Sequence, residues 1–131
     1  MVDKKETCKV ADFGLLREIP KDDTIYQATT ELPWPIRWMA PESLVDREFS
    51  PATDVWSFGV LLWEMYYPKQ LPYAEINCCN NFQVLSKLLS GYRLPIPPEY
   101  PSIVAKIMTA CWQKEPEKRP SFLLISQTLL M

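Results

Sequence analysis

The sequence lacks several patterns that define common functional classes. Its 131 residues include no histidine, and a formal net charge of −2 provides no basic surface for nucleic acid. The three glycines, Gly14, Gly59 and Gly91, are too far apart to form a loop that covers a phosphate. We therefore expect no nucleic-acid partner and no glycine-rich nucleotide loop within these residues.

The cysteines show no CxxC spacing. They are Cys8, Cys78, Cys79 and Cys111, and two of them are adjacent. This pattern favours free thiols in a reducing compartment over a disulfide framework or a zinc site. The charged N-terminus has no apolar core of a signal peptide. The most apolar run, residues 55–67, is too short to cross a bilayer and is interrupted by Ser57 and Glu64. The sequence thus predicts a cytoplasmic chain without a membrane segment.

What is present predicts a mainly helical fold with a packed core. Hydrophobic residues make up 47% of the chain and aromatic residues 12%. The pattern predicts a short β-hairpin over residues 1–11, a long loop, and four or five helices after it. Helices are expected from Ser50 and Pro51 onward, over 81–89 with Phe82, Leu85 and Leu89 on one face, over 102–112, and after Pro120.

The helix that begins at Pro51 is apolar nearly all the way round. Such a helix is normally covered by protein on every side. We therefore expect the 131 residues to be too few to cover their own core, and the isolated chain to expose an apolar patch and to be poorly soluble or molten.

Four motifs in a fixed order resemble the C-terminal half of a protein kinase domain. They are "DFG" at 12–14, "APE" at 40–42, "DVWSFGVLLWE" at 54–64 and "CWQKEPEKRPSF" at 111–122. The stretch "PIRWMAPE" at 35–42 has the form found in tyrosine kinases, plausibly of receptor type. The resemblance implies the C-terminal lobe of an α+β fold without its N-terminal lobe. It divides the partial domain into the hairpin 1–11, an activation segment 12–42 and a helical lobe 43–131.

The resemblance assigns roles to residues of the activation segment. Asp12 would hold Mg²⁺ against nucleotide phosphates, and Phe13 would pack under a regulatory helix of the N-terminal lobe. Tyr26 would be the phosphorylation site, with Arg17 as a partner for its phosphate and acidic residues 22–23 as its flank.

Other roles implied by the resemblance concern the substrate and the lobe itself. Trp34 and Pro35 would contact the substrate tyrosine. Glu42 would pair with Arg119 in a largely buried bridge, and Asp54 would hydrogen-bond the backbone of a catalytic loop. Trp56 would be a core residue. The segment departs from the family in two places: Ile25–Tyr26 stands where many receptor kinases have two tyrosines, and Trp34 stands where leucine is commoner.

Other parts of a kinase are missing from the sequence. Without histidine there is no His-Arg-Asp catalytic loop, and no lysine lies in a strand that resembles V-A-I-K. The family's catalytic-loop asparagine would fall just before Met1, so the cut falls inside a strand. We therefore expect ATP and Mg²⁺ to be cofactors of a parent kinase, and this chain alone to bind neither and to be inactive.

Two alternatives of different kinds remain open at this point. The chain is either a fragment of an active tyrosine kinase or a non-catalytic module that competes with a full-length kinase. Expected partners are protein tyrosine substrates, an activating tyrosine kinase and the missing N-terminal half. An unrelated helical protein would require the four ordered motifs to be coincidence. Residue by residue, Asp12 could be an ordinary turn residue, Tyr26 an exposed loop tyrosine and Asp54 a solvated residue near a helix start.

Overall fold

The described residues form five α-helices and little β-structure, so the fold is mainly helical, as the sequence predicts. The computed structural model describes residues 1–29, 34–76 and 81–131. Within them lie α1 (Pro41–Asp46), α2 (Pro51–Tyr66), α3 (Asn81–Leu89), α4 (Ser102–Cys111) and α5 (Phe122–Leu130). Four short 3₁₀ turns are also present: η1 (Phe13–Leu15) and η2 (Ile36–Trp38) before α1, η3 (Ala74–Ile76) between α2 and α3, and η4 (Pro116–Lys118) between α4 and α5. No helix in the described part of the chain is long and apolar enough to span a membrane.

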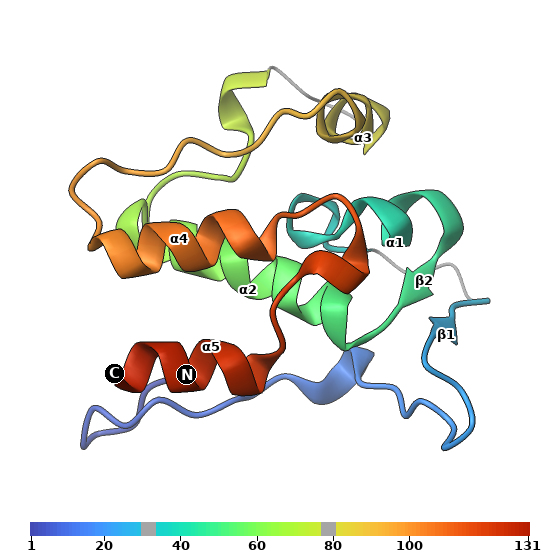
Figure 1. The fold of residues 1–131 in the computed structure, drawn as a ribbon, viewed down its shortest axis with the longest axis horizontal. Helices are drawn as coiled ribbons and strands as arrows, with labels where there is room; N and C mark the ends of the chain where they lie inside the picture. The colour runs from blue at the N-terminus through green and yellow to red at the C-terminus, as the bar shows by residue number, and fades with distance from the viewer. Residues whose placement is uncertain (30–33, 77–80) are drawn as a thin grey trace.

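Helix α2 lies at the centre of the helical body. Figure 1 shows α4 alongside it, with α3 and α5 on opposite sides of this pair. The helix begins where the sequence predicts: Pro51 is its first residue, and the Ser50 amide donates to Thr53 Oγ1 at 3.0 Å. The close approach of α4 requires Gly59, because a Cβ there would lie 2.7 Å from Trp112 Nε1 and 2.8 Å from Cys111 Cβ.

The core is formed mainly by α2 and α4, with contributions from α3 and α5. Its fully buried side chains include Trp56, Val60 and Met108, and Ile125 joins them from α5. On α2, however, Leu61 and Met65 are exposed. The described residues thus leave Leu61 and Met65 on one side of this apolar helix uncovered.

The β-structure is small and lies in two places. Residues 1–9 reverse direction as the predicted hairpin does, closed by an isolated antiparallel bridge between Val2 and Cys8. A separate two-stranded sheet pairs β1 (Tyr26–Gln27) with β2 (Glu48–Phe49), with Tyr26 opposite Phe49. Its ladder continues in the hydrogen bond from the Ala28 amide to the Arg47 carbonyl at 3.0 Å. The sheet joins the predicted loop to the helical body, and the sequence pattern did not reveal it.

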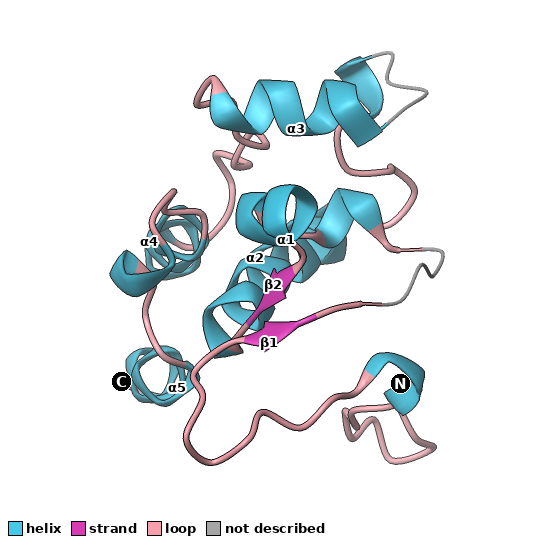
Figure 2. Cartoon of the chain, turned by 90° about the vertical axis from the view of Figure 1, so that its right-hand side faces the viewer, coloured by secondary structure: helices cyan, strands magenta, loops and turns pink. Residues whose placement is uncertain are grey.

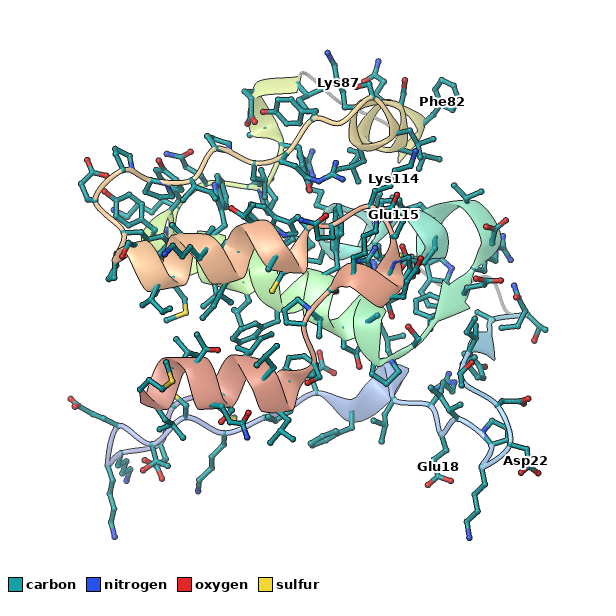
Figure 3. The ribbon with its side chains drawn as sticks, in the orientation of Figure 1. Glu18, Asp22, Phe82, Lys87, Lys114 and Glu115 are labelled. Atoms are coloured by element: carbon teal, nitrogen blue, oxygen red, sulfur yellow. The ribbon has the colours of Figure 1, made fainter. Side chains whose placement is uncertain are left out.

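The predicted helix over 81–89 is present, but its predicted buried face is wrong. Phe82 is 75% exposed and Leu89 49% exposed, whereas Val84 and Leu88 are only 3% and 1% exposed. Figure 3 shows Phe82 pointing outward from α3. The helix ends in a Schellman motif around Gly91, whose φ is +94°, so the predicted glycine cap is in place.

The N-terminal segment, residues 1–27, contributes to the surface of the molecule and not to its core. No side chain in residues 1–27 is buried. Figure 2 shows this segment separated from α5, although the two overlap in Figure 1. Cys78, Cys79 and positions 30–33 of the predicted activation segment lie outside the described residues.

Candidate functional site

One cavity of about 540 Å³ brings together most of the residues that the sequence singled out. It lies where the N-terminal segment and β1 face η2, α1, β2 and the start of α2. The sequence-predicted residues that line it are Asp12, Phe13, Arg17, Tyr26, Trp34, Pro35 and Asp54. These residues are up to 42 positions apart in the chain, so only the fold places them around one space.

Asp12 is held in an unusual backbone conformation at one edge of the cavity. Its φ of 65° and ψ of 69° lie in the left-handed region, which non-glycine residues rarely occupy, and it precedes η1. The carboxylate is exposed. Strained residues of this kind concentrate at functional sites, because surrounding structure has to hold them.

Phe13 lines the cavity but is largely exposed. Its side chain is 61% exposed, and neighbouring Leu16 is 65% exposed. The role that the resemblance implies, packing under a helix of another lobe, requires a partner that these residues do not include.

Arg17 and Tyr26 both line the cavity, but no hydrogen bond joins them in the described structure. The Arg17 guanidinium turns back on its own segment and donates to the carbonyls of Leu16 at 2.6 Å and Gly14 at 3.3 Å. Tyr26 is half-buried in β1. Glu18 and Asp22, on the loop between them, point away from the body (Figure 3). The acidic flank expected near Tyr26 is therefore exposed.

Trp34 and Pro35 form the opposite wall of the cavity. The Trp34 ring stacks on Phe49, with centroids 5.3 Å apart and planes 25° apart. Pro35 is exposed and immediately precedes η2. The stack fixes an aromatic and proline surface against which a planar side chain can pack. Phe49 is a wall residue that the sequence analysis missed, because its place depends on the β1–β2 pairing.

Asp54 enters the cavity from the first turn of α2. Desolvation by neighbouring atoms raises the pKa of its carboxyl above the ordinary 3.8, although the residue still reaches solvent. Its carboxylate makes no hydrogen bond to any described side chain or backbone group. Asp54 is thus a partly desolvated acceptor aimed at a space, and it is available to a backbone segment that would fill the space.

Below the cavity, a charged pair ties α1 to the chain after α4. Arg119 binds Glu42 through two hydrogen bonds, Nη1 to Oε1 at 2.6 Å and Nη2 to Oε2 at 2.9 Å. The two side chains are 0% and 16% exposed. The guanidinium also lies over the ring of the buried Trp56, 5.1 Å from its centroid, with Arg93 5.0 Å from it. This arrangement is structural and holds α1 beneath the site.

The chemistry available at the site is that of the Asp12 carboxylate beside an aromatic and proline surface formed by Trp34, Phe49 and Pro35. Asp12 offers a carboxylate of the kind that Mg²⁺ takes together with nucleotide phosphates, so the residue fits the ion. In the described part of the chain, no three acidic, cysteine or histidine side chains gather into a metal-binding group.

Comparison with known proteins agrees with the motifs in the sequence. The family model for protein tyrosine and serine/threonine kinases matches residues 1–129. The chain is 44% identical over 129 residues to the tyrosine-protein kinase Srms of Homo sapiens, a match that covers 98% of this chain and 25% of the relative. It is also 44% identical over 127 residues to protein sevenless of Drosophila melanogaster, covering 97% of this chain and 5% of the relative. The chain therefore spans a quarter or less of these relatives.

Proposed function

The chain belongs to the family of protein tyrosine and serine/threonine kinases, and we propose that it is part of a longer protein tyrosine kinase. The observation that carries the proposal is the cavity that Asp12, Tyr26, Pro35 and Asp54 share. In this proposal the parent transfers the γ-phosphoryl group of ATP to tyrosines of protein substrates. The 131 residues supply the metal-holding turn, the activation segment and the peptide-binding wall.

Each cavity residue has a role in this proposal. Asp12 would hold Mg²⁺, which neutralises charge on the transferred phosphoryl group. Pro35 and Trp34 would pack against the ring of the substrate tyrosine. Tyr26, after phosphorylation by an activating tyrosine kinase, would draw the nearby Arg17 guanidinium away from its own carbonyls, because a phosphate binds arginine more strongly than a neutral carbonyl does.

Asp54 and the uncovered apolar surface support a missing catalytic loop. The partly desolvated carboxylate faces the cavity without a partner among the described groups, and Leu61 and Met65 of the same helix are exposed. We propose that a segment of the parent occupies this space and that Asp54 accepts hydrogen bonds from its backbone. The parent would be cytoplasmic in this region and, from the sequence resemblance, of receptor type.

Fragment complementation tests the proposal. The chain would be co-expressed with the part of the Srms kinase domain that precedes the matching region, and phosphorylation of a tyrosine peptide would be measured with Mg²⁺ and ATP. We expect no transfer by the chain alone, transfer by the pair, and loss of transfer in the pair with Asp12→Asn.

Two outcomes would count against it. Equal activity with and without Asp12→Asn would mean that the Asp12 carboxylate is not required for phosphoryl transfer. A chain that inhibits a full-length tyrosine kinase but never complements would favour the competing interaction module instead.

A further inference from the structure

After the polar first turn of α2, two polar side chains interrupt its apolar run, and both bind the same residue of η2. Ser57 and Glu64 are seven positions apart, which is close to two helical turns and places them on one face. Ser57 Oγ donates to the Trp38 carbonyl at 2.7 Å. The Trp38 indole Nε1–H in turn donates to Glu64 Oε2 at 2.7 Å. The helix thus holds Trp38 by its backbone and by its side chain.

Burial alone does not explain the carboxylate at position 64. The indole N–H groups of Trp56 and Trp112 are buried and have no hydrogen-bond partner in the described structure. Trp38 is only half-buried, at the edge of the core, yet it has a charged acceptor. A hydrogen bond to a carboxylate is shorter and stronger than one between neutral groups, so it fixes the orientation of the ring.

Trp38 belongs to the turn that directly follows Trp34 and Pro35. The Trp38 amide donates to the Pro35 carbonyl at 3.0 Å, and the Met39 amide donates to the Ile36 carbonyl at 3.1 Å. These bonds form the 3₁₀ turn that directly follows the wall. The Arg37 guanidinium donates to the Pro72 carbonyl and ties the same turn to the chain before η3. Glu64 and Pro35 are therefore linked through the hydrogen bonds of a single 3₁₀ turn.

We propose that Glu64 is a positioning residue for substrate peptides. Through the Trp38 indole it holds η2 against α2, and so sets where Trp34 and Pro35 meet the ring of a substrate tyrosine. The inference rests on the proposed function, because it takes Pro35 to be part of the peptide site. Ser57 provides the second hold, on the backbone of the same residue.

The test compares two substitutions of Glu64 in the full chain. Glu64→Gln keeps an acceptor oxygen for the indole, whereas Glu64→Ala removes it. The control is Glu99→Ala, since Glu99 is an exposed carboxylate that accepts a hydrogen bond from the Tyr66 hydroxyl at 2.7 Å. The probe is a synthetic peptide with the sequence of residues 18–29, which contains Tyr26.

Three quantities would be measured for each variant: the Kd of the peptide, amide hydrogen exchange at Trp38 and Met39, and Tm. We expect Glu64→Ala to raise the Kd of the peptide about tenfold and to speed amide exchange at Trp38 and Met39 about tenfold. Each change corresponds to the loss of one charge-assisted hydrogen bond. Exchange in α4 should not change. Glu64→Gln should keep the Kd and the exchange rates close to those of the wild type, and Glu99→Ala should change neither quantity.

Two results would overturn the inference. The first is wild-type exchange at Trp38 and Met39 in Glu64→Ala. The second is faster exchange throughout α2 and α4, which would make Glu64 a general stability residue. If the wild-type chain binds no peptide, the proposed function fails at Pro35, and the exchange data still decide whether Glu64 positions the turn.

Discussion

The N-terminal segment and the helical body differ in how much of each is buried and in which proposed functional residues each contains. From α1 onward the chain builds a core in which Trp56, Val60 and Met108 are fully buried. Residues 1–27 bury no side chain, and Val10 and Phe13 remain exposed. Yet Asp12, Arg17 and Tyr26, which carry most of the proposed chemistry, lie in this segment.

The difference teaches where the precision of the site comes from. The wall of Trp34 and Pro35 is held by α2 and β2, so the body fixes it. Asp12 has no comparable support, because its neighbours are exposed and its backbone is strained. We infer that the wall is formed within these residues, whereas the turn at Asp12, to which we assign the metal ion, gains its final geometry from contacts outside them.

The largest effect is expected from breaking the buried charge pair of the body. Arg119→Met keeps the aliphatic stem over Trp56 but leaves the carboxylate of Glu42 without its partner. Leaving one buried charge unpaired costs about 3–5 kcal/mol, and urea denaturation would measure this loss of unfolding free energy.

The adjacent residue provides the matched control. Lys118 forms an exposed ion pair with Glu115 at 3.4 Å, and exposed pairs contribute about 0–1 kcal/mol. Lys118→Ala should therefore change stability little. Similar losses for the two substitutions would show that burial of the Glu42–Arg119 pair is not what stabilises the body.

The second prediction compares one glycine from each region. In Gly59→Ala the new Cβ would lie under 3 Å from atoms of Trp112 and Cys111, so α2 and α4 have to separate. Overpacking costs about 1–3 kcal/mol, and the better helix propensity of alanine returns up to about 1 kcal/mol. We expect a net loss of about 1–2 kcal/mol in the unfolding free energy.

Gly14→Ala serves as the counterpart in the N-terminal segment. The nearest atom to its new Cβ would be Asp12 Oδ1 at 3.8 Å, an ordinary contact. Stability should stay within the about 0.5 kcal/mol that is usual for surface substitutions. A large loss at Gly14 would mean that the segment is more tightly packed than its exposure indicates.

The sequence predicts the helices better than their partners. Ser50 and Pro51 mark the start of α2 because capping is local chemistry. The buried face of α3 was wrong because Phe82, Leu85 and Leu89 have helical spacing, and so do Val84 and Leu88. Only the position of the neighbouring helices decides which set is buried, and a periodic pattern does not contain that information.

The residues of the candidate site also divide into those that local motifs predict and those that only the fold brings into contact. Motif order gave Asp12, Tyr26, Pro35 and Asp54, and the fold places all four around one cavity. The contact between Trp38 and Glu64 was missed, because it joins residues 26 positions apart through a side-chain orientation. The one local signal was the presence of Ser57 and Glu64 in an apolar run, which sequence analysis treats only as an interruption.

The smallest effect is expected from Asp54, which lies on the border between the two regions. The native pKa of its carboxyl is raised above 3.8 by desolvation, so the native state holds the proton to higher pH than the unfolded state does. The contribution of Asp54 to stability therefore falls as pH rises from the pKa of the unfolded state through the higher pKa of the native state. Asp54→Asn has no charge to desolvate, so its Tm should exceed that of the wild type by more at pH 7 than at pH 3. The corresponding change in unfolding free energy should stay within about 0.5 kcal/mol, as is typical of surface substitutions. Thermal unfolding of both proteins across this pH range would measure the difference.

A difference in Tm that does not vary with pH, or that favours the wild type at neutral pH, would contradict this prediction. It would mean that the positive end of the α2 dipole stabilises the carboxylate more than desolvation in the cavity destabilises it. In that case Asp54 would belong energetically to the helical body and not to the space that we assign to a catalytic loop.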